Sequence, residues 1–325
     1  MAKAGYVYIL VVAAVPSGAV KFLTVRRCGL IWLLAVCAMV GCSESREGSL
    51  GDELCPSNME ELVALSAAEL ERVDVGRMNL ICADAVADFG ESELPRLLRR
   101  LDEWAEDARR AEVRYRKTYE REPMRYDNSY AKYCAVNLAL TIKEDFRCRY
   151  QKEHIRSGAM ADFTSPRFFR NPDDVFVSGL LRHRLGTCSS FPVLLVALGR
   201  RLGYPLYLKL TGGHMFCCWD DGKERFNLET NGDAVDTPSD EHYLKEPCYG
   251  MAARSAQERT AERLMVKLTN AEALSVFLET AGYCAEANGK LPQALFFYRT
   301  ALKYRPESAI LSRLAGRHLS SGGNR

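Results

Sequence analysis

Apolar residues follow the helical period through much of residues 57–150. One stripe recurs every three or four positions, as the buried face of an amphipathic helix does; it comprises Leu94, Leu97, Leu98, Leu101, Trp104, Ala105 and Ala108. Ser57–Glu60 and Ser66–Glu69 have the spacing of capping boxes and predict two helix starts. A further helix is expected to begin near Ser129. The pattern predicts a helical N-terminal part in which the apolar faces of the helices form the hydrophobic core.

The pattern changes to short, strand-like runs after residue 205. Leu206–Leu210 and His214–Trp219 predict two strands on either side of a glycine pair, and residues 224–230 predict a third. Asp221-Gly222 has the composition of a two-residue hairpin turn between the last two strands. We therefore expect a small antiparallel sheet in this part of the chain.

The two-residue turn would fix which residues of that hairpin oppose each other. Counting outward from Asp221-Gly222 sets His214 directly opposite Glu229. Opposed side chains have Cβ atoms roughly 4.5–5.5 Å apart, so the carboxylate can hold one imidazole nitrogen and leave the other for a further partner. A bulge would shift this register by one residue.

A buried helix is predicted to begin at Cys188. Thr187 or Ser189 can serve as N-cap, Pro192 is tolerated only in a first turn, and glycine and proline at 203–205 are stop signals. At a helix N-terminus, unsatisfied backbone N–H groups and the positive dipole end favour a thiolate over a thiol. Cys188 is therefore a candidate nucleophile, with His214 as its base and Glu229 as the group that orients the base.

The C-terminal residues 261–325 predict a helical tail. Small and aromatic residues fall at the spacing of one tetratricopeptide helix pair over about 275–308; they are Leu278, Ala281, Gly282, Ala294, Tyr298, Ala301 and Pro306. Residues 307–319 are expected to add a capping helix. A lone helix pair cannot bury its apolar face, so the tail should dock on the rest of the chain or on a protein partner.

Charge and length set broad limits on function. The chain has 325 residues and 47% hydrophobic content, which is ample for a core and exceeds the usual size of one domain. The first acidic residue is Glu44, and beyond the four cations of the first 42 residues the charges are nearly balanced. This balance gives no indication of a nucleic-acid partner.

The first 42 residues have the features of a targeting segment. Arg26-Arg27, an apolar run over 29–40 and then Gly41-Cys42 resemble a bacterial lipoprotein signal, in which the cysteine is lipid-modified. Residues 43–56 would then be a polar tether. A second apolar stretch, Tyr6–Val15, leaves a membrane anchor open, as does a start site assigned too far upstream. We expect an exported protein of the cell envelope, attached to the membrane.

Export would permit disulfides among the remaining cysteines, whose pairing the sequence does not determine. Eight remain after the signal, lipid and nucleophile positions are set aside: Cys55, Cys82, Cys134, Cys148, Cys217, Cys218, Cys248 and Cys284. No Cys-x-x-Cys or His-x-x-x-His spacing occurs, so a metal site is not predicted. No cofactor is predicted either.

Four motifs give the chain a resemblance to a known superfamily: Gly186-Thr187-Cys188, Leu202-Gly203-Tyr204-Pro205, Gly213-His214-Met215-Phe216 and Phe226-Asn227-Leu228-Glu229. They resemble the transglutaminase-like branch of the papain-like cysteine enzymes, over roughly residues 171–243. The likeness is to a bacterial group in which such a domain precedes tetratricopeptide sequence. Glu229 stands where transglutaminases usually have aspartate, and Ser189 where many have tryptophan.

The resemblance implies an α+β papain-like catalytic domain over residues 151–260, with Cys188, His214 and Glu229 as its catalytic residues. The expected chemistry is acyl transfer, with a protein or peptide substrate and water as the acceptor. Amine transfer and cleavage of cell-envelope peptide crosslinks use the same three residues and remain open. A lipid-tethered scaffold, binding protein through the same domain and tail without turnover, is the alternative from another class.

Overall fold

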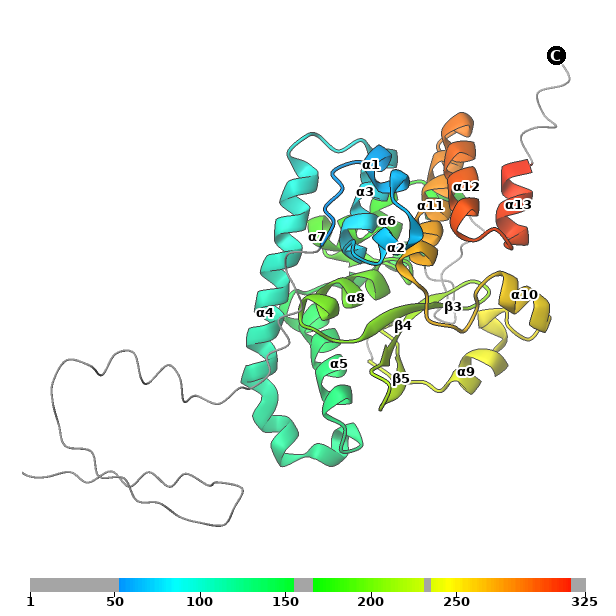
Figure 1. Ribbon diagram of the computed structural model, residues 1–325. Helices are drawn as coiled ribbons and strands as arrows, with labels where there is room; N and C mark the ends of the chain where they lie inside the picture. The colour runs from blue at the N-terminus through cyan, green and yellow to red at the C-terminus, as the bar shows by residue number, and fades with distance from the viewer. Residues whose placement is uncertain (1–52, 155–165, 231–234, 317–325) are drawn as a thin grey trace, which may run out of the picture. The chain divides into compact units, whose positions relative to one another are not determined.

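The computed structural model describes residues 53–154, 166–230 and 235–316 of the chain. Helices dominate, and two small sheets complete a mixed α+β architecture (Figure 1), which confirms the predicted α+β class. The described residues belong to one compact unit, Gly51–Arg325. Cys42, the predicted lipidation site, and the rest of segment 1–42 lie outside the described residues, as does most of the tether at 43–56.

The N-terminal part is helical, as predicted. Its elements are α1 (Met59–Ala64), α2 (Ala67–Leu70), α3 (Val75–Ala87), α4 (Glu93–Arg121), η1 (Pro123–Tyr126), α5 (Tyr130–Leu140) and η2 (Thr141–Asp145). Ser66 and Glu69 form the predicted capping box, and Ser129 caps α5. The box predicted at Ser57 is wrong, because the Asn58 side chain accepts from the Glu61 N–H at 2.9 Å and starts α1 one residue later.

The long helix α4 is amphipathic, and its predicted stripe is core. Six of the seven stripe residues are buried and the seventh, Leu98, is half-buried against them. This face packs against α3, α5, α7 and α8. Burial of an apolar stripe stabilises the helix by roughly 1.5–3 kcal/mol for each large aliphatic or aromatic side chain, so packing rather than intrinsic propensity holds α4.

Short elements connect the helical part to the site. They are β1 (Arg149–Tyr150), η3 (Lys152–His154), η4 (Pro166–Phe169), α6 (Pro172–Val175), α7 (Val177–His183) and β2 (Leu185–Gly186). Strands β1 and β2 pair in parallel, with Tyr150 opposite Gly186. This pairing brings residue 150 beside the segment that leads to Cys188.

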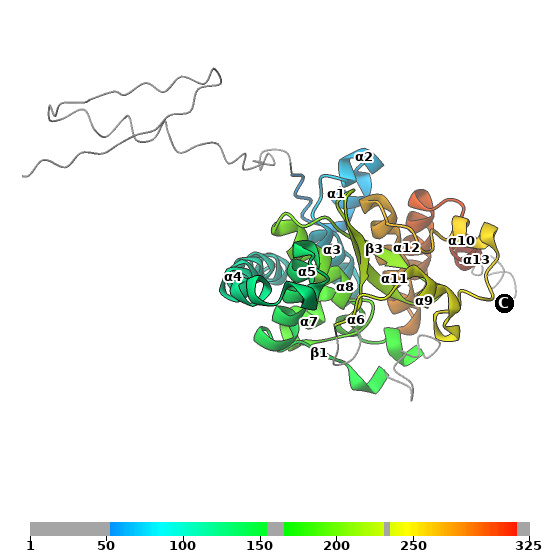
Figure 2. The ribbon, with the colours of Figure 1, turned by 90° about the horizontal axis from the view of Figure 1, so that it is seen from below.

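Helix α8 (Phe191–Arg201) forms the centre of the core. Every residue from Phe191 to Gly199 is buried, because α3, α4 and α5 cover one side and β3 and β4 the other (Figure 2). The sheet has the order β3 (Leu206–Leu210), β4 (Met215–Asp220), β5 (Arg225–Leu228), and both pairs are antiparallel. The predicted three-strand sheet is confirmed.

The face of the sheet turned away from α8 is covered by α9 (Asp240–Lys245) and η5 (Pro247–Tyr249). A second apolar cluster fills this layer, formed by Phe216, Tyr243, Tyr249, Met251 and Leu264. Lys209 of β3 has no exposed surface, and its Nζ donates to Asn227 Oδ1 at 3.1 Å and to Asp240 Oδ1 at 2.7 Å. The ammonium group therefore ties α9 to the sheet.

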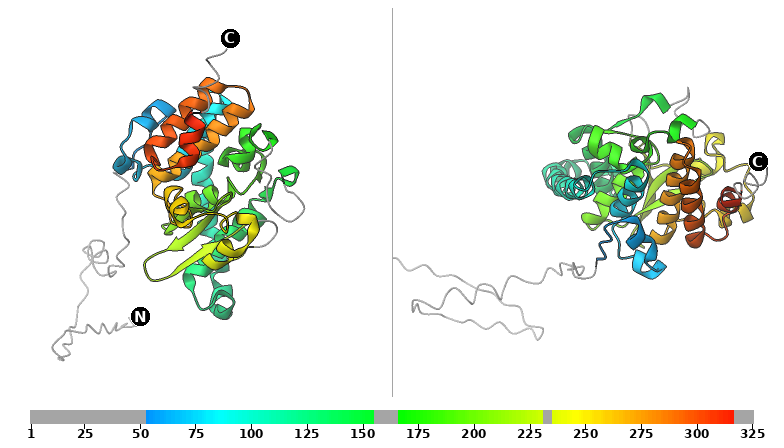
Figure 3. Two further views of the ribbon diagram at one scale, coloured as in Figure 1. Left: turned by 90° about the vertical axis from the view of Figure 1, so that its right-hand side faces the viewer. Right: turned by 90° about the horizontal axis from the view of Figure 1, so that it is seen from above.

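The C-terminal tail is helical, as predicted, and packs on the rest of the chain. Its helices are α11 (Asn270–Ala287), α12 (Leu291–Tyr304) and α13 (Ala309–Gly316), and α10 (Ala256–Ala261) precedes them. Helices α11 to α13 lie side by side (Figure 3), and α11 also packs on α3. A Cβ on Gly282 would lie 2.2 Å from the Tyr298 ring, so glycine allows α11 and α12 to approach closely. Their assignment to a tetratricopeptide repeat stays a prediction.

Two further findings concern the described ranges alone. Within them, no helix combines the length and hydropathy needed to cross a bilayer. All nine cysteines that lie in these ranges are free thiols. Seven of the nine are buried, and only Cys55 and Cys248 are exposed.

Candidate active site

Cys188 lies in the turn that leads into α8. The helix begins at Phe191 and has Ser190 at its N-cap, so the predicted caps Thr187 and Ser189 are wrong. Ser190 Oγ instead accepts from the Thr187 N–H at 2.9 Å and closes the turn. The N–H groups of Ser190 and Phe191 both donate to Thr187 O at 3.1 Å, which joins the turn to the helix. The thiol therefore lies just beyond the positive end of the α8 dipole.

Tyr150 is a site residue that the sequence did not reveal. Its hydroxyl oxygen accepts the backbone N–H of Cys188 at 2.7 Å, and the pairing of β1 with β2 brings it there. Burial, together with the Cys188 thiol, raises the pKa of Tyr150 well above its ordinary value, so the phenol keeps its proton. Strands of two residues carry no alternation, and no sequence signal could have identified this neighbour.

His214 and Glu229 are in contact, by a different geometry from the one predicted. The hairpin pairs Asp220 with Arg225, so residues 221–224 form the connection and the predicted direct opposition is wrong. The cause is Asp221, whose carboxylate accepts hydrogen bonds from the N–H groups of Lys223 and Glu224 at 2.8 and 2.7 Å. These bonds stabilise a four-residue loop in place of a two-residue turn.

The longer loop shifts the register by two residues, which makes His214 and Glu229 diagonal neighbours. Side chains alternate with a period of two, so both still point to the same face of the sheet. Diagonal neighbours lie roughly 7–8 Å apart, with their Cβ atoms somewhat closer, yet His214 Nε2 lies 2.6 Å from Glu229 Oε2. The length of the glutamate side chain spans the added distance.

Glu229 is held in place by two further donors. The Tyr243 hydroxyl donates to Oε2 at 3.1 Å, and the Thr230 N–H donates to Oε1 at 3.1 Å. Burial, reinforced by the Glu229 carboxylate, raises the pKa of Tyr243 far above its ordinary range, so it remains a donor. Glu229 itself is 8% exposed. A buried carboxylate with three donors has a fixed orientation, and so has the imidazole that it holds.

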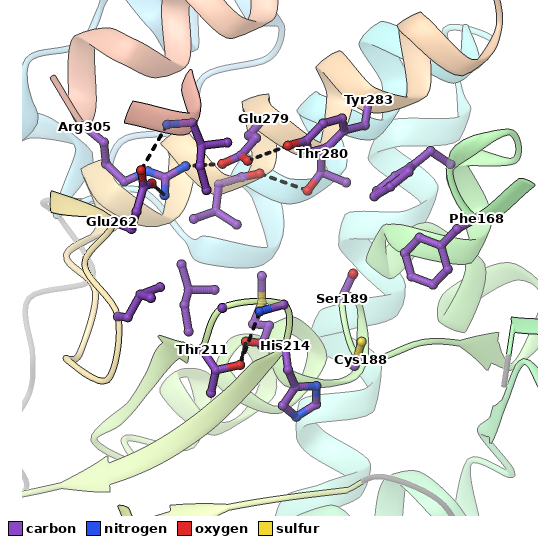
Figure 4. Close-up of a pocket in the computed structure, with 18 of the residues that line it drawn as sticks. Phe168, Cys188, Ser189, Thr211, His214, Glu262, Glu279, Thr280, Tyr283 and Arg305 are labelled. Carbon is purple, nitrogen blue, oxygen red and sulfur yellow. Dashed lines mark hydrogen bonds and ion pairs between the residues drawn. The ribbon is translucent and has the colours of Figure 1, made fainter. Parts of the chain in front are cut away.

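The environment of His214 favours the imidazolium form. Burial by itself lowers the pKa of His214, but the Glu229 carboxylate and the Cys188 thiol outweigh it and raise this pKa to about 10. The ring is 4% exposed and packs against Tyr249, with ring centroids 5.4 Å apart. Cys188 lies beside the His214 ring (Figure 4). The structure thus brings together all three residues that the sequence selected, Cys188, His214 and Glu229.

Six other buried thiols have a different environment from Cys188. Burial raises the pKa of each; they are Cys82, Cys134, Cys148, Cys217, Cys218 and Cys284. A thiol of raised pKa is a poor nucleophile at neutral pH. Of the seven buried cysteines in the described ranges, Cys188 is the one that lines a pocket together with His214.

A cavity of about 170 Å³ opens next to Cys188 and His214. Cys188, Ser189 and the Thr211–Met215 segment form one end of it, and Glu262, Glu279 and Arg305 lie at the other (Figure 4). Its walls are mainly apolar. A thiol that is only 3% exposed is therefore reached through a pocket rather than from the open surface.

No protein-family model, curated protein or solved structure matches this chain. Within the described ranges, no group of three or more His, Cys, Asp or Glu side chains is arranged to hold a metal ion. The chemistry of the site is inferred from its own contacts: a thiol, an imidazole bonded to a carboxylate, a phenol at the thiol's backbone N–H, and a pocket.

Proposed function

We propose that this protein is a thiol-dependent acyl-transfer enzyme of the transglutaminase-like, papain-like superfamily, which hydrolyses amide bonds in protein or peptide substrates. The observation that carries the proposal is the 2.6 Å contact between His214 Nε2 and Glu229 Oε2, together with the Cys188 side chain beside the same imidazole. A thiol next to an imidazole that a buried carboxylate orients is the arrangement that nucleophilic catalysis by cysteine requires.

The order of the site along the chain supports the same proposal. A cysteine at a helix start, followed by a histidine and an acidic residue on neighbouring strands, is the order of the superfamily that the four motifs resemble. The cysteine precedes α8, the histidine precedes β4 and the glutamate follows β5. The assignment to a papain-like fold rests on this order and on the motifs.

The first half of the reaction forms a thioester. Cys188 gives its proton to His214, whose raised pKa of about 10 favours the imidazolium. The thiolate attacks the amide carbonyl carbon, so an S–C bond forms and the oxygen gains negative charge. When the C–N bond breaks, the His214 imidazolium protonates the departing amine. Glu229 stabilises the imidazolium until that transfer.

Tyr150 supplies stabilisation for the oxyanion in this proposal. Its oxygen accepts the Cys188 N–H at 2.7 Å, and its own O–H is directed to the Cys188 side chain. A substrate oxygen that arrives beside the thiol would take this O–H in place of the sulfur. The raised pKa of Tyr150 keeps the group a neutral donor throughout the reaction. Losing one such donor in other enzymes costs roughly 10²–10³ in kcat.

Water completes the reaction. Deprotonated by His214, it attacks the thioester carbonyl, the C–S bond breaks, and the carboxylic acid leaves while Cys188 regains its proton. Protein or peptide is the proposed substrate, and the tail is a possible contact for a protein partner. From the first 42 residues we also propose export to the cell envelope, with attachment to the membrane through Cys42 or an N-terminal anchor.

The test is the pH dependence of alkylation at Cys188, measured in reduced protein by iodoacetamide and peptide mass mapping. A free thiol, with a pKa of roughly 8.5, reacts roughly 200-fold more slowly at pH 6 than at pH 9. We expect the Cys188 rate to differ by less than about tenfold between these pH values. The exposed Cys55 reports the general thiol reactivity in the same sample.

Two variants complete this experiment. His214→Ala should make the alkylation rate at Cys188 rise steeply from pH 6 to pH 9, whereas His242→Ala should not, because His242 contacts Tyr249 at 3.3 Å rather than the thiol. An equally steep rise of the Cys188 rate in the wild-type protein would overturn the proposal and leave the non-catalytic scaffold. Cys188→Ala then separates the two classes, since an enzyme loses turnover and a scaffold keeps its binding partner.

A further inference from the structure

The pocket beside Cys188 is built jointly by the catalytic segments and the C-terminal tail. Leu210 and Met215 come from the sheet, and Phe168 comes from η4. Leu264 precedes the tail helices and Val276 lies on α11. These side chains are apolar and mostly buried, so the space between them favours an apolar occupant.

The tail wall is fixed to the catalytic sheet by backbone hydrogen bonds. Met265 N donates to Leu210 O at 2.8 Å, and Leu268 N donates to Leu208 O at 2.9 Å, along the free edge of β3. On the other side, the Phe169 and Tyr283 rings pack with centroids 4.9 Å apart. The position of α11 relative to Cys188 is therefore set by the fold.

Four charged residues line the pocket, Arg254 among them, and the three at the end away from the thiol are already paired within the protein. Arg305, 5% exposed, donates to the Glu279 carboxylate and, at 2.9 Å, to Ser275 Oγ. The Glu262 carboxylate accepts from Ser308 Oγ at 2.7 Å and from the Ile310 N–H at 3.1 Å. Groups satisfied in this way do not need a charged substrate to complete them.

The cavity has the volume of one bulky side chain. An apolar cavity of about 150 Å³ in another protein is large enough to hold a benzene ring, and this cavity measures about 170 Å³. Building on the proposed function, we propose that the helical tail forms the specificity pocket of the enzyme. The pocket receives a bulky apolar side chain, of leucine or phenylalanine size, next to the amide bond that Cys188 attacks.

The experiment uses three peptidyl chloromethyl ketones that differ only in the side chain beside the reactive group: leucine, alanine or aspartate. The Cys188 thiolate displaces chloride from each, forming a thioether and releasing the chloride ion. Differences of a few methylenes in an apolar pocket change kcat/KM by roughly 10–200-fold. We expect the leucine probe to label Cys188 at least tenfold faster than the alanine probe, and the aspartate probe to be slowest.

Substitutions on α11 test whether the tail causes the preference for the leucine probe. Thr280 lines the pocket, is half-buried and lies on α11, and it is no part of the proposed catalytic set. Thr280→Phe fills the space and should remove the leucine preference, while iodoacetamide labelling of Cys188 keeps its wild-type ratio of rates between pH 6 and pH 9. Thr280→Val keeps the volume of the side chain and should keep the preference. Val276→Phe, one turn earlier, replaces Thr280→Phe if that variant does not fold.

The outcomes separate this inference from the function on which it rests. If iodoacetamide reveals no activated pair, the proposed function fails and the inference falls with it. If the pair is activated but the three probes react equally, only the pocket assignment is overturned. Retention of the leucine preference in both Phe variants would likewise overturn the role of the tail.

Discussion

His214 Nε2 and Glu229 Oε2 lie 2.6 Å apart, although the two residues are diagonal rather than directly opposed in the sheet. The contact depends on a four-residue connection that shifts the register by two and leaves both side chains on one face. It also depends on the reach of glutamate.

Glu229→Asp should therefore disrupt the site although it conserves the charge. The shorter side chain cannot span the separation between diagonal neighbours, which lie roughly 7–8 Å apart. We expect the rate of Cys188 alkylation at pH 6 to fall about as far as in Glu229→Gln, by roughly tenfold or more. Equal rates in Glu229→Asp and the wild-type protein would contradict the diagonal geometry.

Folding stability should depend on pH through His214. Its pKa is raised to about 10 in the folded protein, after burial and the opposing effects of Glu229 and Cys188 are combined, against roughly 6.5 when unfolded. The stabilisation is then complete below pH 6.5 and is lost as the pH rises toward 10, with a slope of at most about 1.4 kcal/mol per pH unit.

Urea unfolding at pH 7 and pH 9 measures this slope. In a Cys188→Ala background, where no neighbouring thiol supplies that proton, the free energy of unfolding should fall more between these pH values than in the same background carrying His214→Gln, which cannot take up the proton. Taking the difference between the two proteins cancels the titration of their shared tyrosines and other thiols. Parallel curves for the two proteins would argue against a charged imidazole in the folded state.

Tyr150→Phe should lower turnover more than it lowers alkylation. Removing the hydroxyl removes the proposed oxyanion donor, and we expect kcat to fall by roughly 10²–10³. Alkylation of Cys188 by iodoacetamide forms no oxyanion and should change much less. An increase in kcat would show instead that the hydroxyl obstructs the Cys188 N–H to which it is bonded.

The ion pair that anchors α9 should respond asymmetrically to substitution. The Lys209 side chain is fully buried, whereas that of Asp240 is 46% exposed. Asp240→Ala leaves a buried ammonium without its counter-ion and should cost about 3 kcal/mol of unfolding free energy. Lys209→Met leaves a solvated carboxylate and should cost less than about 1 kcal/mol. Thermal unfolding of both variants gives the comparison, and equal costs would contradict the argument.

The sequence alone determined the elements whose pattern is local. The stripe on α4 and the capping box at Ser66 predicted helices, and the runs near residues 206–230 predicted the sheet. The turn at Asp221 was misjudged because its carboxylate bonds to two backbone N–H groups, which residue type alone does not report. The pairing of His214 with Glu229 survived this error, since an even shift of register preserves the face.

Only the tertiary structure decided what surrounds the three residues. Tyr150 reaches the Cys188 N–H through a two-residue parallel pairing, and Tyr243 reaches Glu229 from a helix beyond the sheet. Arg305, more than a hundred residues after Cys188, lines the same pocket. Local sequence patterns predict the periodicity and the capping residues of single helices and strands. Which elements become neighbours is set by the joint burial of their apolar faces, and the pattern of one segment alone does not determine that burial.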